Sequence, residues 1–178
     1  MADVNAQPDA RATKMVDALV RSRRGSLAAG AALGGLALIA GLAFRAIRGG
    51  EPEAAPDTPF SQVDEDEARL MLRAMVAATV ADGLVDADER RRLDEAVEAA
   101  GLDRDGRAWL EAELADPASI DAIADPVTDP EAAARIYAAA RLAIEADTLQ
   151  ERQFLRMLAE ALDVPEAATG RVDRALAG

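Results

Sequence analysis

The sequence contains no cysteine and no histidine, and aromatic residues make up only 3% of it. The chain therefore has no disulfide, no thiolate nucleophile, no imidazole acid or base and no His/Cys metal site. Paired carboxylates could still cleave glycosides, but that chemistry also needs a sugar-binding cleft lined with aromatics. We therefore expect no enzyme and no cofactor, and we expect Trp109 and Tyr137 in the core or in a groove.

Apolar residues make up 51% of the 178 residues, and many of them are alanine. Alanine and leucine are strong helix formers, whereas strands favour β-branched and aromatic residues. The composition therefore predicts an all-α protein.

Charge is divided unevenly along the chain. Residues 1–50 carry seven basic and three acidic side chains, a net charge of +4, whereas the remaining residues carry thirteen basic and thirty acidic ones, a net charge of −17. A surface so acidic repels the phosphate backbone, so we expect no nucleic acid partner.

Residues 25–44, GSLAAGAALGGLALIAGLAF, form a run of twenty without charge. As a helix this run would be about 30 Å long, the thickness of the hydrocarbon core of a bilayer. Its seven large apolar side chains contribute about −2 to −4 kcal/mol to insertion, offset in part by five glycines. The run predicts a single transmembrane helix in contact with membrane lipid, preceded by a basic N-terminal tail at residues 1–24.

Small residues recur every fourth position in this run, as at Ser26, Gly30 and Gly34. Such spacing lets two helices approach closely in lipid, so a homodimer through this face is an additional expectation.

Basic residues flank the predicted span unequally, with five before it and two closely after it. This bias predicts a cytoplasmic N-terminus and a soluble domain outside the cytoplasm. Two alternatives compete with the anchor. One is a cleaved signal peptide, and the other is a twin-arginine export signal at Arg23 and Arg24.

Residues 45–61 include three prolines and several acids, which is typical of a solvated linker. A helical pattern then runs through residues 62–178, which we expect to form one helical domain.

Two segments of this domain are apolar on nearly all sides, residues 69–81 and 135–146. Such helices belong at the centre of a bundle. Each ends in Ala-Asp, a turn and Glu-Arg, and each is followed by an amphipathic helix. The domain therefore looks like a pseudo-repeat of helical hairpins.

Turn chemistry accounts for many of the polar residues between these helices. Gly83 suits the left-handed conformation that ends a helix, and Pro130 suits a first helical position. Asp86 with Glu89, and Thr148 with Glu151, have the spacing of a capping box.

The runs AMVAATVADGLVDADERRRL and DPEAAARIYAAARLAIEADTLQERQFLRMLAEAL resemble the YebE-type family of uncharacterised bacterial inner-membrane proteins. The soluble part of that family is similar to the helical fold of the tellurite-resistance protein TerB. The resemblance covers about residues 62–178. It implies an all-α, TerB-like domain and a membrane location, and it implies no established reaction.

Carboxylates gather in the two turns that follow the central helices. Hard divalent cations prefer such oxygen ligands, although the spacing here differs from an EF-hand loop and helix caps explain several of the residues. These residues are weak metal-site candidates, and we expect no firm metal site. They are Asp82, Asp86, Asp88, Glu89, Asp147 and Glu151.

These features together favour a membrane-anchored helical scaffold that binds an unknown protein partner, with a role in envelope stress or maintenance. The alternative is a divalent-cation sensor that uses the acidic turns between helices.

Overall fold

The computed structural model describes residues 11–23, 63–83, 87, 90–91 and 104–177. Within these residues the secondary structure is entirely helical, which confirms the all-α prediction for this part of the chain. The helices are α1 (Arg11–Arg23), α3 (Glu65–Thr79), α5 (Arg104–Ala115), α6 (Ile120–Ala124), α7 (Pro130–Ala143), α8 (Leu149–Ala161) and α9 (Glu166–Ala177).

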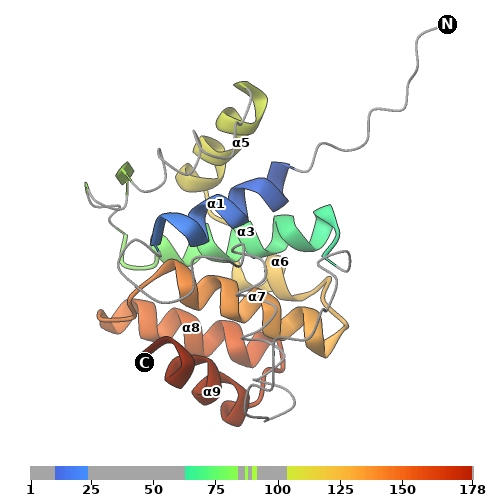
Figure 1. Ribbon diagram of the computed structural model, residues 1–178, viewed down its shortest axis with the longest axis vertical. Helices are drawn as coiled ribbons and strands as arrows, with labels where there is room; N and C mark the ends of the chain where they lie inside the picture. Colours follow the sequence, from blue (N-terminus) through green and yellow to red (C-terminus); the bar gives the residue numbers. More distant parts are fainter. Residues whose placement is uncertain (1–10, 24–62, 84–86, 88–89, 92–103, 178) are drawn as a thin grey trace, which may run out of the picture.

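Helices α3 and α7 form the centre of the bundle, and the other helices pack around them (Figure 1). They share the largest interface in the described part of the chain. Both are rich in buried alanine, and the small side chains let the two backbones approach closely. These are the two central helices that the sequence predicts, and Asp64 and Asp129 cap their N-termini.

A largely buried ion pair joins the two central helices. The Nε and Nη2 atoms of Arg135 on α7 donate to the carboxylate of Glu67 on α3 at 2.5 and 3.1 Å. Burial alone lowers the pKa of Arg135, but the hydrogen bond to Glu67 and the charges of Glu67, Asp129 and Glu131 together outweigh it, so the pKa is raised. The pair favours one register of α3 against α7, because breaking it would leave the carboxylate of Glu67 largely buried without its partner.

The structure confirms several of the predicted caps and turns, although α3 ends at Thr79 and α7 at Ala143, before the ends of the predicted segments 69–81 and 135–146. Thr148 and Glu151 form a capping box at the start of α8. Pro130 occupies the first turn of α7, and Gly83 has a φ of +83° just after α3. Asp86 and Glu89, the other expected capping box, lie outside the described residues, so the pseudo-repeat is described only in its second hairpin, α7 and α8.

Residues 11–23 form a helix that packs on the bundle, whereas the sequence pattern predicted a basic tail. Met15 and Val16 are fully buried in the common core, and α1 contacts both α3 and α7. The apolar residues of this helix recur at helical spacing among its charges, so one stripe can face the core while Lys14 is exposed. The basic composition concealed this amphipathic pattern.

The docking of α1 bears on the predicted membrane topology. The predicted transmembrane helix at residues 25–44 and the predicted linker at 45–61 lie outside the described residues, and no described helix is long and apolar enough to cross a membrane. Helices α1 and α3 flank this stretch and contact each other, so they lie on the same side of any membrane. A single crossing by residues 25–44 would separate them. The packing therefore conflicts with the single-pass topology, whereas contact of residues 25–44 with lipid stays a prediction.

Candidate protein-interaction groove

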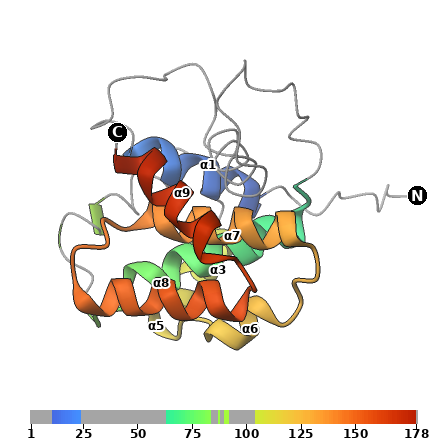
Figure 2. The same cartoon turned by 90° about the horizontal axis from the view of Figure 1, so that it is seen from below.

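A groove of about 690 Å³ runs between α8 and α9, above α7. Both helices pack on α7, and they diverge from the turn that joins them (Figure 2). The divergence leaves Tyr137 and Arg141 of α7 at the base of the groove.

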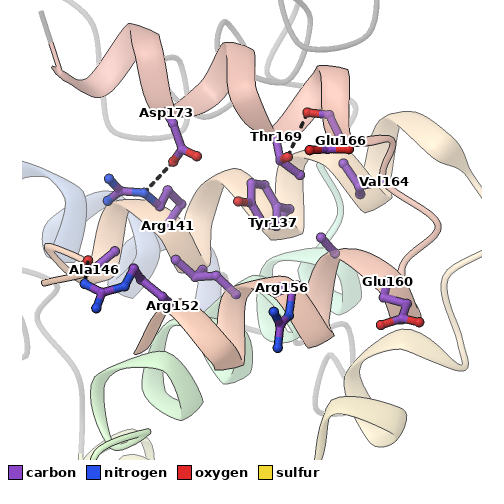
Figure 3. Close-up of a pocket in the computed structure, with 12 residues that line it drawn as sticks. Tyr137, Arg141, Ala146, Arg152, Arg156, Glu160, Val164, Glu166, Thr169 and Asp173 are labelled. Atoms are coloured by element: carbon purple, nitrogen blue, oxygen red, sulfur yellow. Dashed lines mark hydrogen bonds and ion pairs between the residues drawn. The ribbon is translucent and has the colours of Figure 1, made fainter. Parts of the chain in front are cut away.

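The floor and the inner walls of the groove are largely apolar. Tyr137, in the middle of α7, lies at the base, and Leu155, Ala159 and Val164 line the sides. Figure 3 shows the ring of Tyr137 between α8 and α9. Burial raises the pKa of Tyr137 to about 12, and the charge of Asp173 adds to this effect. The phenol therefore stays protonated at neutral pH and keeps its hydrogen-bond donor.

The rim of the groove is charged, and the charges change sign along α8. Arg152, Arg156 and Glu160 are spaced by four residues, which places them in one row along the helix. Glu166 lies at the start of α9, close to the Glu160 end (Figure 3). The charged row on α8 thus runs from basic to acidic, whereas on the facing helix α9 the acidic Asp173 lies beside Arg141 at the arginine end.

Two arginines at the basic end are held by the chain that joins α7 to α8. Arg152 donates to the backbone carbonyls of Asp147 at 2.6 Å and of Ala146 at 3.2 Å. Arg141 donates to Asp173 on α9 at 2.7 Å and to the carbonyl of Ile144 at 3.0 Å. Because an arginine carries five N–H donors, both side chains are positioned and still have donors for a ligand.

Two large apolar side chains on α8 are exposed to solvent next to this rim. Leu149 is 71% exposed and Met157 is 46% exposed, and they are the exposed large hydrophobic residues of the described part of the chain. Leu149 lies three residues before Arg152, and Met157 lies three residues before Glu160, so each neighbours a rim charge on the helix surface. Neither side chain lines the groove itself, so α8 carries a second, exposed apolar surface beyond the charged row.

The acidic turns do not form a metal centre in the described residues. Glu151 is buried, and its Oε2 atom accepts hydrogen bonds from the Thr148 backbone N–H and hydroxyl at 3.1 and 3.0 Å. Asp82 and Asp147 are exposed. No group of three or more acidic residues within the described ranges could hold a metal ion. Asp86, Asp88 and Glu89 lie outside those ranges, so their part in a cation site stays a prediction.

The sequence pattern did not predict the groove, although Tyr137 was expected in a core or a groove. A usable signal was present in α8. Leu149 and Met157 lie off the apolar stripe of that helix, beside a row of charges at every fourth residue. Such a helix has a second apolar surface that does not pack into the core of the bundle.

Neither a curated protein nor a solved structure matches this chain. The model of a protein family of unknown function, DUF533, matches residues 8–176. The match covers α1, the central helices and the groove-forming helices alike. The chain therefore belongs to the DUF533 family.

Proposed function

We propose that this chain is a helical protein-interaction module that binds a segment of a partner protein in the groove between α8 and α9. The observation that carries the proposal is the exposure of Leu149 and Met157 beside an apolar groove of about 690 Å³. An apolar centre with a polar rim is the usual anatomy of a protein-binding surface, and exposed apolar side chains beside a charged row fit that arrangement.

The energetics of the surface favour a protein ligand. Complete burial of a leucine or methionine side chain contributes roughly 1.5–3 kcal/mol, so covering Leu149 and Met157 offers a partner an appreciable part of its binding energy. The floor is preformed, because Tyr137 is buried and α8 and α9 both rest on α7. Little ordering of the groove is therefore needed on binding.

The composition is consistent with a binding role. The chain has no cysteine or histidine, and its only tyrosine forms the floor of the groove with a raised pKa. A phenol that ionises near pH 12 is a poor base at neutral pH. The groove thus offers apolar contact, hydrogen bonds and paired charges.

The finer family assignment and the cellular setting belong to the same proposal. The two turn motifs support a YebE-type relationship with a TerB-like bundle, and residues 25–44 support association with a bacterial inner membrane. With α1 docked on α3, the bundle and the N-terminal helix occupy one face of that membrane. We include a role in envelope stress or maintenance in the proposal, because an inner-membrane protein is part of the cell envelope.

Photo-crosslinking in the native cell tests the interaction surface. Gln153 is exposed and lies four residues from both Leu149 and Met157, so a benzoylphenylalanine at this position reports on whatever covers α8. Ala112 on α5 is also exposed and serves as the control position. The proposal expects a discrete protein adduct from Gln153 that the Ala112 position does not give. Identical adduct patterns from the two positions would contradict it.

A further inference from the structure

We propose that Arg152 anchors the partner segment by binding one of its carboxylates at the end of the groove where α7 leads into α8. This inference rests on the proposed function and names the chemical group that the groove recognises. Arg152 lines the groove and is exposed, and its side chain donates only to the backbone carbonyls of Ala146 and Asp147. Within the described part of the chain no carboxylate pairs with it, so its charge is available to a ligand.

The hydrogen bonds of Arg152 leave one edge of its guanidinium group open. Both bonds come from the Nη1 atom, at 2.6 and 3.2 Å, so the Nε and Nη2 atoms have no acceptor among the described residues. A carboxylate binds an arginine best through two parallel N–H donors. Nε and Nη2 are the two donors through which Arg135 binds Glu67. The open edge of Arg152 therefore presents the donor pair that a carboxylate requires.

Arg141 shows the same arrangement with its carboxylate in place. Its Nη1 atom donates to the carbonyl of Ile144, in the same turn, and its Nε atom donates to Asp173 on α9 at 2.7 Å. Both arginines lie at the Ala146 end of the groove (Figure 3). Asp173 offsets the charge of Arg141, whereas no described residue offsets that of Arg152. A partner carboxylate supplies at Arg152 what Asp173 supplies at Arg141.

The other charges of the groove favour a single carboxylate over a more highly charged anion. Glu160, Glu166 and Asp173 line the same groove, and the whole chain has a net charge of −13. A phosphate ester carries a charge of about −1.5 to −2 at neutral pH, so these carboxylates repel it more strongly than they repel a carboxylate. The wall beside Arg152 is apolar, with Leu155 one turn along α8. We therefore expect an aspartate or a glutamate flanked by apolar side chains.

Crosslinking of the full chain in its native cell locates the partner carboxylate. Benzoylphenylalanine in place of Leu149, one turn from Arg152 on the surface of α8, captures the partner, and mass spectrometry identifies the crosslinked segment. We expect this segment to contain an aspartate or a glutamate. The yield of the adduct at a subsaturating level of partner then measures the effect of each further substitution.

Substitutions of two arginines separate a specific anchor from a general effect of charge. Arg152→Gln removes the open edge and should lower the adduct yield about tenfold. Arg152→Lys keeps the charge and a donor for the turn but has no paired donors, so it should melt like the unsubstituted protein and still lose several-fold in yield. Arg156→Gln is the matched comparison. It removes the same charge from the same wall, but the Nη2 atom of Arg156 already donates to Gln153, so the loss should stay below about threefold.

Substitutions in the partner test for direct contact. Each aspartate and glutamate of the crosslinked segment is changed in turn to asparagine or glutamine. One of these changes should reproduce the loss caused by Arg152→Gln, and it should add little when the two are combined, because both remove the same interaction.

The outcomes separate the anchor from the proposed function. A crosslinked segment without an acidic residue, equal losses from Arg152→Gln and Arg156→Gln, or additive losses in every combined variant would overturn the anchor and leave the interaction groove in place. The absence of any protein adduct from the Leu149 position would contradict the proposed function itself.

Discussion

The carboxylate of Glu65, in the first turn of α3, accepts a hydrogen bond from the backbone N–H of Ala12, in the first turn of α1, at 2.7 Å. The same carboxylate accepts from the hydroxyl of Thr13 at 3.0 Å. The first N–H groups of a helix have no partner within the helix, and here a residue more than fifty positions away supplies one. This contact ties the N-terminal helix to the bundle.

Removal of this carboxylate is expected to loosen α1. Glu65→Ala leaves the N-terminus of α1 without its acceptor and should lower the free energy of unfolding by about 1–2 kcal/mol. Urea unfolding followed by circular dichroism measures the change. Asp66→Ala is the control, because Asp66 is exposed and forms its ion pair with Arg69 on its own helix. Asp66→Ala should lower the free energy of unfolding by no more than about 0.5 kcal/mol. Equal losses in the two variants would contradict the role of Glu65.

The docking of α1 also predicts the topology in cells. The chain has no cysteine, so a single introduced cysteine is a unique chemical reporter. Lys14 on α1 and Asp121 on α6 are both exposed, and they lie on opposite sides of residues 25–44 in the sequence. Lys14→Cys and Asp121→Cys should react with a membrane-impermeant maleimide from the same side of the membrane. Reaction from opposite sides would show that α1 does not dock on α3 in the cell.

Ionisation of Tyr137 offers a spectroscopic test of the groove floor. It is the only tyrosine, and its pKa rises to about 12 from an ordinary value of 10, mainly because of burial. The folded state therefore binds the phenolic proton more tightly than the unfolded state. The stability that this supplies is fully present below about pH 10 and is lost as the pH rises toward 12.

The absorbance of tyrosinate during a pH titration measures this shift directly. We expect the midpoint near pH 12 in buffer and near pH 10 in concentrated urea. Tyr137→Phe should also reduce the loss of stability between these two pH values. A native midpoint near pH 10 would mean that the floor of the groove is open to water.

Substitution of glycine by alanine is expected to have opposite effects on stability at two positions. Gly170 lies within α9, and an added Cβ would meet only the Nη1 atom of Arg174 at an ordinary 3.6 Å. Gly170→Ala should therefore stabilise the protein by about 0.5–1 kcal/mol, because alanine favours the helix and restricts the unfolded chain. Gly83 has a φ of +83°, so Gly83→Ala should cost about 1 kcal/mol. Thermal unfolding of the two variants measures both, and effects of the same sign would contradict the backbone geometry.

Local patterns in the sequence predicted most of the described fold. Pro130, Thr148 and Glu151 act within a few residues of themselves, so their capping roles can be inferred from spacing alone. The contact of Glu65 with Ala12 cannot be inferred in this way, because it joins residues separated by a long stretch of chain. Residues 11–23 were predicted to be a tail for another reason, because their basic composition concealed the apolar spacing.

The groove was harder to predict from the sequence than the helix caps, because it depends on how the helices pack. Tyr137 forms a floor only because α8 and α9 diverge above α7, and no pattern within one helix encodes that divergence. Leu149 and Met157 were visible as apolar residues, but their exposure follows from which face of α8 turns toward α7. A sequence alone therefore indicates the composition of such a surface and not its position.

The central claim is that a protein partner covers Leu149 and Met157. Its most direct test is quantitative co-purification of the tagged full chain carrying Leu149→Glu and Met157→Glu. The matched control carries Ala108→Glu and Ala112→Glu, which add the same charge at exposed positions of α5. We predict that the groove variant folds normally and loses at least about nine tenths of a specific partner that the control retains, because two buried apolar contacts are replaced by charges. Equal recovery of every partner by the two variants would contradict the claim.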